Sequence, residues 1–186
     1  MQALFVSLVA VAIAEVGDKT QLLALILAAR YRKPWPICIG IFVATLINHA
    51  LAGEAGVLLM HWLSPAVLRW IVGLSLLSVA AWALFPDTIS DSDTRHATHH
   101  GVFVATAVGF FLAEMGDRTQ VATAVLAAHY QPLWQVVAGT TLGMLAANVP
   151  VVFLGARFAH RLPLRATRVV ACVLFAVLGA IVLARG

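Results

Sequence analysis

The chain has 186 residues, of which 62% are hydrophobic and 11% are charged, and its formal net charge is +4. A soluble domain carries about 25% charged residues, so this composition excludes a soluble protein and indicates an integral membrane protein. The positive charge does not indicate nucleic-acid binding, because the excess Lys and Arg lie near the ends of apolar runs, where such residues orient a membrane protein.

Six apolar runs predict six transmembrane helices, because each run is long enough to cross a bilayer of about 30 Å. The first and fourth runs exceed the usual span of about 20 residues, so we expect these two to tilt or to break at Gly17 and Gly116. The predicted fold is therefore all-α. The predicted spans are about 3–29, 36–60, 67–85, 101–128, 134–156 and 166–184.

The two halves of the chain repeat each other at a constant offset of 99 residues. The segment EVGDKTQ at 15–21 recurs as EMGDRTQ at 114–120. One register held over about 55 residues indicates an internal duplication. Matches at the same offset include Tyr31 with Tyr130, Trp35 with Trp134, Gly40 with Gly139 and Arg69 with Arg168.

Each half contains three predicted helices, so residues 1–85 and 101–186 form two repeats joined by a cytoplasmic linker at 86–100. Because three is an odd number, the second repeat must enter the membrane upside down relative to the first. Inverted repeats of this kind are typical of secondary transporters, which bind substrate near the bilayer midplane between the repeats.

The charge of the loops predicts the orientation of the chain. The segments 30–36, 86–100 and 157–165, together with Arg168, hold eight Lys and Arg on one side of the membrane. The other side has only Arg69 and Arg185. Positive charge concentrates on the cytoplasmic side of membrane proteins, so both termini are expected on the opposite side.

The repeated motif places acidic residues where hydrocarbon is expected. On a continuous helix, Glu15, Asp18 and Gln21 are spaced so that they lie near one face, and the second copy has the same spacing. A carboxylate inside a membrane is costly unless it is paired, protonated or in contact with a wet cavity. The motif therefore indicates a function within the membrane.

A purely structural interpretation would pair Glu15 with Lys19, and Glu114 with Arg118, four residues apart on each helix. It does not explain why each copy has two carboxylates but only one cation. If inversion brings the copies together, four carboxylates and two cations leave a net charge of −2, which suits one divalent cation or two protons. Metal and protons would then compete for the same oxygens.

The candidate ligands in the two motifs are all oxygen atoms, which suits Ca²⁺, Mn²⁺ or Mg²⁺. Zinc or copper would be expected to use His or Cys, and neither motif contains one. Lys19 and Arg118 are candidate counter-ions or gates. The candidate metal-binding residues are Glu15, Asp18, Thr20, Gln21, Glu114, Asp117, Thr119 and Gln120.

Both motifs fit the pattern E-x-G-D-K/R-T/S without a departure. The chain thereby resembles the small cation/proton antiporter family that includes the Golgi calcium/manganese antiporters and bacterial manganese exporters. The resemblance covers nearly the whole chain, whose short linker is similar to a compact bacterial form. It implies that the acidic residues of both motifs bind the transported cation, Mn²⁺ favoured over Ca²⁺, and exchange it for protons. The resemblance to a bacterial form also implies a bacterial inner membrane, so the termini that loop charge places opposite the cytoplasm are expected in the periplasm.

Polar residues outside the motifs are further candidates. Asn48, His49, Glu54 and Asn148 lie within predicted spans and could line a transport path or form hydrogen bonds between helices. The linker histidines could collect a metal ion, although solubility is the favoured interpretation. Cysteines within spans are expected to be packing residues rather than a disulfide or metal pair. These residues are His96, His99 and His100, and Cys38 and Cys172.

We therefore predict a secondary transporter that exports a divalent cation from the cytoplasm in exchange for protons. Its partners would be the cation, protons and the lipid bilayer, with no enzymatic activity, resident cofactor or nucleic-acid partner. The rival interpretations are a divalent-cation channel, a structural partner subunit and, less favoured, an intramembrane hydrolase. Hydrolysis would need an unequal site with a nucleophile, whereas the two motifs are nearly identical. The choice of Mn²⁺ or Ca²⁺, the stoichiometry and the oligomeric state are left open.

Overall fold

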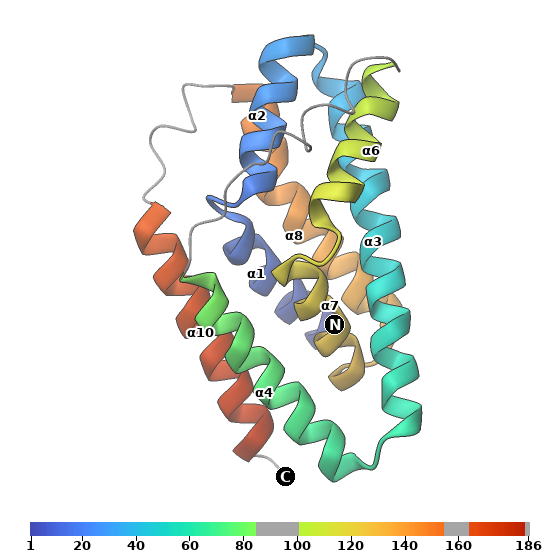
Figure 1. Cartoon of the computed structure of the whole chain (residues 1–186), viewed down its shortest axis with the longest axis vertical. Coiled ribbons are helices and arrows are strands. Elements are labelled where there is room, and N and C mark those ends of the chain that lie inside the picture. The colour runs from blue at the N-terminus through green and yellow to red at the C-terminus, as the bar shows by residue number, and fades with distance from the viewer. Residues whose placement is uncertain (85–100, 155–163, 185–186) are drawn as a thin grey trace.

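The computed structural model describes residues 1–84, 101–154 and 164–184, and nearly all of these are helical. The predicted linker, with its three histidines, and most of the basic segment at 157–165 lie outside the described residues. Figure 1 labels the helices. Their bounds are α1 Gln2–Glu15, α2 Lys19–Tyr31, α3 Pro34–Trp62, α4 Pro65–Ala83, α6 Val102–Glu114, α7 Arg118–His129, α8 Leu133–Leu154 and α10 Leu164–Ala184.

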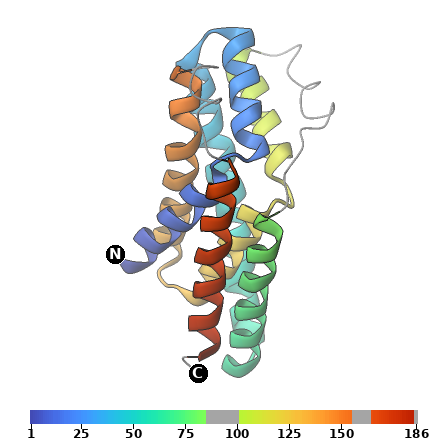
Figure 2. The same cartoon turned by 90° about the vertical axis from the view of Figure 1, so that its left-hand side faces the viewer.

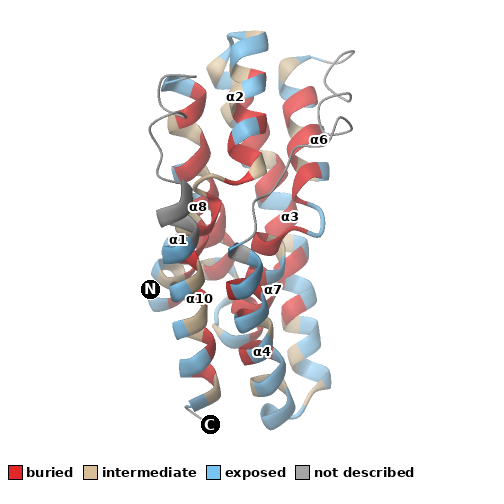
Figure 3. Ribbon diagram, turned by 60° about the vertical axis from the view of Figure 1, so that its left-hand side comes forward, coloured by how far each residue is buried: buried red, intermediate tan, exposed pale blue. Residues whose placement is uncertain are grey.

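The helices have the length and surface of a membrane protein. Among the described residues, α3, α4 and α8 are long and apolar enough to cross a membrane, and α1, α6 and the described part of α10 are shorter apolar helices. Large hydrophobic side chains such as Phe42, Leu46 and Trp70 are exposed, while buried residues follow the interior of the bundle (Figure 3). A surface of this kind suits lipid, and the chain is an all-α, multi-pass membrane protein.

The first and fourth predicted spans are both broken at the expected glycines, which separates α1 from α2 and α6 from α7. Gly17 has φ 84° and Gly116 has φ 76°, a left-handed conformation that glycine adopts without the steric penalty of a Cβ. The expectation that Glu15, Asp18 and Gln21 share one face of a continuous helix is therefore wrong. The motif instead ends one helix, makes a turn and begins the next.

Both helix breaks lie near mid-height in the bundle (Figure 1). The long helices α3 and α8 run in opposite directions, with α2 and α6 in the upper half and α1 and α7 in the lower half. The helices α4 and α10 form a pair beside the lower half (Figure 2). The helix α1 packs against α8, and α6 packs against α3. Each motif helix therefore contacts the long helix of the other half of the chain.

Two glycines at matching positions allow these contacts. A Cβ on Gly40 of α3 would lie 2.7 Å from the Thr106 side chain of α6, and a Cβ on Gly139 of α8 would lie 2.9 Å from the Ser7 side chain of α1. The second contact lies at the same 99-residue offset from the first, with the two halves exchanged. Small residues let membrane helices approach closely, so the two contacts correspond in detail.

The two cysteines pack as apolar side chains. Cys38 lies in α3 and Cys172 in α10, and each is half-buried against a hydrophobic core. Both are free thiols. The prediction that they are small packing residues is confirmed by these contacts.

Candidate cation-binding site at the helix breaks

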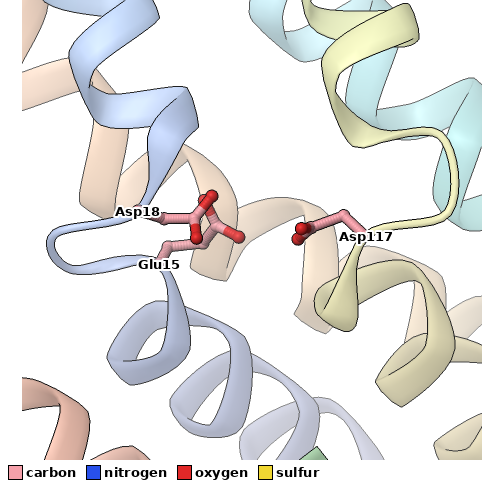
Figure 4. A group of neighbouring side chains, drawn as sticks. All are labelled: Glu15, Asp18 and Asp117. Carbon is pink, nitrogen blue, oxygen red and sulfur yellow. The ribbon is translucent and has the colours of Figure 1, made fainter. Parts of the chain in front are cut away.

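The two helix breaks direct acidic side chains toward each other in the interior of the bundle. Carboxylate oxygens of Glu15, Asp18 and Asp117 lie within 4.8 Å of one another, and all three residues are buried. Glu15 and Asp18 flank the first break and Asp117 follows the second (Figure 4). The structure thus brings residues of both motif copies into one group, here termed the carboxylate triad.

Glu114, the fourth acidic residue of the motifs, is fully buried but lies outside the carboxylate triad. Its Oε2 lies 3.6 Å from Nε2 of His49, which comes from α3. Glu114 remains next to the triad at the second helix break, where its backbone oxygen accepts a hydrogen bond from the Asp117 amide at 3.0 Å. The four predicted carboxylates therefore form an unequal arrangement of three plus one.

The cationic residues of the motifs form ion pairs across the two copies. The Arg118 guanidinium contacts Asp18, and the Lys19 Nζ lies 3.5 Å from an oxygen of Asp117. These partners differ from the structural interpretation, in which each cation pairs with the glutamate four residues before it. The Arg118 side chain is 4% exposed and that of Lys19 is 22% exposed, so the two matching ion pairs differ in burial.

The aspartates begin the second helix of each break. Asp18 is the N-cap of α2 and accepts a hydrogen bond from the Thr20 amide at 3.4 Å. Asp117 caps α7 in the same way through the Thr119 amide at 3.3 Å. The Thr20 hydroxyl also donates to Glu15 Oε2 at 2.5 Å, and the Thr119 hydroxyl donates to Asp117 at 3.2 Å. Capping thus orients Asp18 and Asp117, and the Thr20 hydroxyl orients Glu15.

The glutamines hold the glycine turns. The side-chain oxygen of Gln21 accepts a hydrogen bond from the Gly17 amide at 2.9 Å, and that of Gln120 accepts one from the Gly116 amide at 2.7 Å. The Gln21 amide group also donates to the backbone oxygen of Ala147 in α8. The structure gives both residues a positioning role, and their predicted role as ligands stays a prediction. The repeated four-residue spacing of Gly and Gln is the sequence signal for this bond.

Four helix ends meet at the site. The helices α1 and α6 end at Glu15 and Glu114, and a helix C-terminus carries free carbonyl groups and partial negative charge, which favour a cation. The helices α2 and α7 begin there with aspartate caps. Half-helices that meet near the membrane midplane are typical of ion sites in secondary transporters.

The polar residues predicted for the path take different positions. Asn48, His49 and Asn148 are buried, and the Asn48 amide donates to the backbone oxygen of Phe111 in α6. The Asn148 amide donates to the backbone oxygen of Met144 one turn earlier in α8. Glu54 is exposed on α3, so the structure does not bury it with the other three.

Several buried oxygens in this region lack a hydrogen-bond partner within the described part of the chain. They are Oε1 of Glu15, both carboxylate oxygens of Glu114 and the amide oxygens of Asn48 and Asn148. Buried polar atoms of folded proteins almost always have a partner. The unpartnered oxygens of Glu15 and Glu114 lie at the helix breaks with the carboxylate triad, an environment in which a cation or protons would be stabilised.

Comparison with known proteins identifies the same family that the motifs resemble. A family model described as "Divalent cation/proton antiporter GDT1" matches residues 3–91 and 102–186. The chain is 50% identical over 176 residues to a Vibrio cholerae protein named "Putative manganese exporter", a match that covers 94% of the chain and 87% of that relative.

More distant relatives carry related names. The chain is 30% identical over 194 residues to "GDT1-like protein sll0615" of Synechocystis sp., which covers 94% of the chain and 93% of the relative. It is 28% identical over 198 residues to "GDT1-like protein 3" of Oryza sativa subsp. indica, which covers 93% of the chain and 70% of the relative. No solved structure matches the chain.

Proposed function

Because this chain belongs to the divalent cation/proton antiporter GDT1 family, we propose that it exports Mn²⁺ from the cytoplasm in exchange for protons. Membership of the family makes the chain a transporter of divalent cations and not an enzyme. The choice of Mn²⁺ draws on the 50% identical relative named "Putative manganese exporter", with Ca²⁺ as the next candidate. Oxygen ligands suit both ions.

The observation that carries the proposal is the buried carboxylate triad with its unpartnered neighbours. Glu15, Asp18 and Asp117 bind the cation directly, and Glu114 completes the acidic group. Thr20 and Thr119 form hydrogen bonds to these ligands. The two glutamines fix the adjacent glycine turns. Residues outside the ligand set commonly position the ligands of metal sites in this way. Burial of negative charge in this way is costly in a membrane, and the cation or protons relieve that cost.

Exchange follows from competition for the same oxygens. With Lys19 and Arg118 counted, the four carboxylates leave a net charge of −2, which one divalent cation or two protons can neutralise. Carboxylates held close together disfavour simultaneous ionisation. The empty site therefore takes up protons, and arrival of the metal releases them.

The two halves, 1–85 and 101–186, act as inverted repeats of three helices each. The matching contacts of Gly40 with α6 and Gly139 with α1, and the opposite directions of α3 and α8, support this plan. Alternating access moves one repeat against the other around the fixed site. The Arg118 and Lys19 ion pairs join the repeats, so they are candidate gates.

The chain lies in a bacterial inner membrane with both termini in the periplasm. The support is the excess of Lys and Arg in the segments that face the cytoplasm in this topology. The cation then moves from the cytoplasm to the periplasm, while protons move in the opposite direction.

The experiment that tests the proposal is cation uptake into proteoliposomes with and without an imposed pH gradient. Wild type should move Mn²⁺ in a gradient-dependent manner, and Glu15→Gln and Asp117→Asn should lose that flux. Asp91→Asn, which removes a carboxylate from the polar linker, is the matched control and should keep it. Flux that ignores the gradient would instead indicate a channel, and absence of flux in wild type would refute transport.

A further inference from the structure

His49 is a fully buried side chain that the motif chemistry does not use. Its Nε2 lies 3.6 Å from Oε2 of Glu114. That separation exceeds the range of about 2.7–3.2 Å for a good hydrogen bond. Within the described residues, neither ring nitrogen of His49 and neither carboxylate oxygen of Glu114 has a hydrogen-bond partner. The buried His49 imidazole and Glu114 carboxylate thus lie next to each other without forming a hydrogen bond.

We propose that His49 supplies a nitrogen ligand to the transported cation, next to Glu114, and thereby favours Mn²⁺ over Ca²⁺ and Mg²⁺. This inference rests on the proposed function, since it concerns the cation that the carboxylates carry. Glu114 lies at the same helix break as Asp117, whose amide donates to the Glu114 backbone oxygen at 3.0 Å, and Asp117 belongs to the carboxylate triad. His49 therefore adds a ligand type that both motifs lack.

The geometry fits two ligands of one ion. Oxygen and nitrogen ligands lie about 2.0–2.2 Å from a small divalent metal, so two ligands at a right angle are roughly 3 Å apart and wider angles increase that distance. The 3.6 Å between the His49 nitrogen and the Glu114 oxygen falls within this range. A cation beside both atoms would satisfy groups that the protein leaves unpartnered.

The ligand type decides between cations of equal charge. Ca²⁺ and Mg²⁺ bind through oxygen and gain little from an imidazole, whereas affinity for nitrogen rises along the first-row transition metals. A site made only of carboxylates has no such preference. One histidine among carboxylates keeps the site acceptable to Mn²⁺ and makes it poorer for Ca²⁺ and Mg²⁺.

The chain contains its own comparison for this position. Asn148 lies 99 residues after His49, on α8, and is equally buried. Its amide donates to the Met144 backbone oxygen, and its oxygen is unpartnered within the described part of the chain. The second half of the chain therefore offers oxygen where the first offers nitrogen. The substitution His49→Asn would make the two halves alike.

A spectroscopic measurement tests the ligand directly. The full chain, purified without a histidine tag and loaded with Mn²⁺, should show ¹⁴N modulation in its electron spin echo. His49→Asn should lose the modulation, and His61→Asn, an exposed histidine on the same helix, should keep it. Absence of ¹⁴N modulation in wild-type protein with bound Mn²⁺ would overturn the inference, even if the His49 variant does not fold.

A transport measurement tests the preference. In proteoliposomes, His49→Asn should lower the ratio of Mn²⁺ to Ca²⁺ uptake about tenfold, in line with the 10–100-fold effects of altered metal surroundings, and His61→Asn should leave it unchanged. An unchanged ratio in a folded His49→Asn protein that still transports would overturn this inference and leave the antiporter standing. If wild type moves neither cation, the proposed function itself fails.

Discussion

At the scale of single residues, the helix breaks contain two kinds of side chain. Some carry the negative charge of the triad, and others position those carboxylates through hydrogen bonds and ion pairs. Glu15, Asp18 and Asp117 direct oxygens into the triad, while Thr20 donates to Glu15 and thereby orients it. The cations reach across to the opposite copy of the motif, and Arg118 is the more buried of the two. The charge balance of the site therefore depends on both halves of the chain.

Arg118→Ala should destabilise the metal-free protein strongly, because it removes the guanidinium that contacts buried Asp18. Breaking a buried ion pair costs about 3–5 kcal/mol, and thermal unfolding in detergent would report the loss as a large fall in midpoint. Lys19→Ala should cost less, because the Lys19 side chain is 22% exposed. Arg30→Ala, on an exposed position of α2, is the control. Equal shifts for Arg118 and Lys19 would contradict this ranking.

Binding of Mn²⁺ should weaken as the pH falls, because protons and the metal compete for the same carboxylates. Titration of the purified protein with Mn²⁺ across a pH series would measure the change in affinity. Glu15→Gln removes one competing carboxylate, so its residual affinity should depend less on pH than that of wild type. An affinity of wild type that does not change with pH would argue against proton exchange at this site.

At the scale of elements, each helix break is built from local sequence. Gly17 and Gly116 adopt the left-handed conformation that ends one helix, and Asp18 and Asp117 cap the next. The glutamine four residues after each glycine closes the turn through its side-chain oxygen. The breaks are therefore preformed structures, and they place two helix C-termini and two capped N-termini at the site.

Gly116→Ala should destabilise the second break through backbone strain alone. A Cβ at this position would meet nothing within 4 Å, but φ is +76°, and a left-handed conformation costs about 1–2 kcal/mol for an ordinary residue. Gly116→Asn should cost less, because Asn tolerates this conformation. Thermal unfolding of the two variants would compare them. A stability of the Ala variant equal to that of wild type would show that the turn does not depend on the glycine.

At the scale of the whole molecule, each half of the chain packs its motif helix against the other half. The motif helix α1 packs on α8 of the other half, and α6 packs on α3. The Lys19 and Arg118 ion pairs cross between halves in the same way. Neither half therefore completes the carboxylate triad and its ion pairs alone, and relative movement of the halves would change access to the proposed cation site. The symmetry is imperfect at His49 and Asn148, where the chemistry of the two halves differs.

The proposed topology predicts labelling from opposite sides of the membrane. In a background with Cys38 and Cys172 replaced by Ala, Gln2→Cys should react with an impermeant maleimide in intact spheroplasts. Asp91→Cys, in the linker, should react only after lysis. This pattern follows from the distribution of Lys and Arg in the loops. Labelling of Asp91→Cys in intact spheroplasts would reverse the orientation and with it the direction proposed for export.

Much of this protein could be predicted from the sequence, because the relevant forces act between neighbours along the chain. Apolar runs predict spanning helices, a repeat predicts related halves, and a glycine within an apolar run that is too long for one span predicts a helix break. The acidic residues of both motifs stand out because charge is rare in hydrocarbon, and they are Glu15, Asp18, Glu114 and Asp117. These features depend on composition and on local backbone preference.

Only the tertiary structure decided which groups meet. The less favoured, purely structural interpretation pairs Lys19 with Glu15 within one helix, whereas packing of the two halves places Lys19 beside Asp117. The meeting of His49 with Glu114 also depends on the contact between α3 and α6. Helix packing brings together residues that are far apart in the chain. The local sequence around a residue does not predict which distant residue it will contact. The sequence by itself determined the chemical groups of the site, and the packing of helices determined their partners.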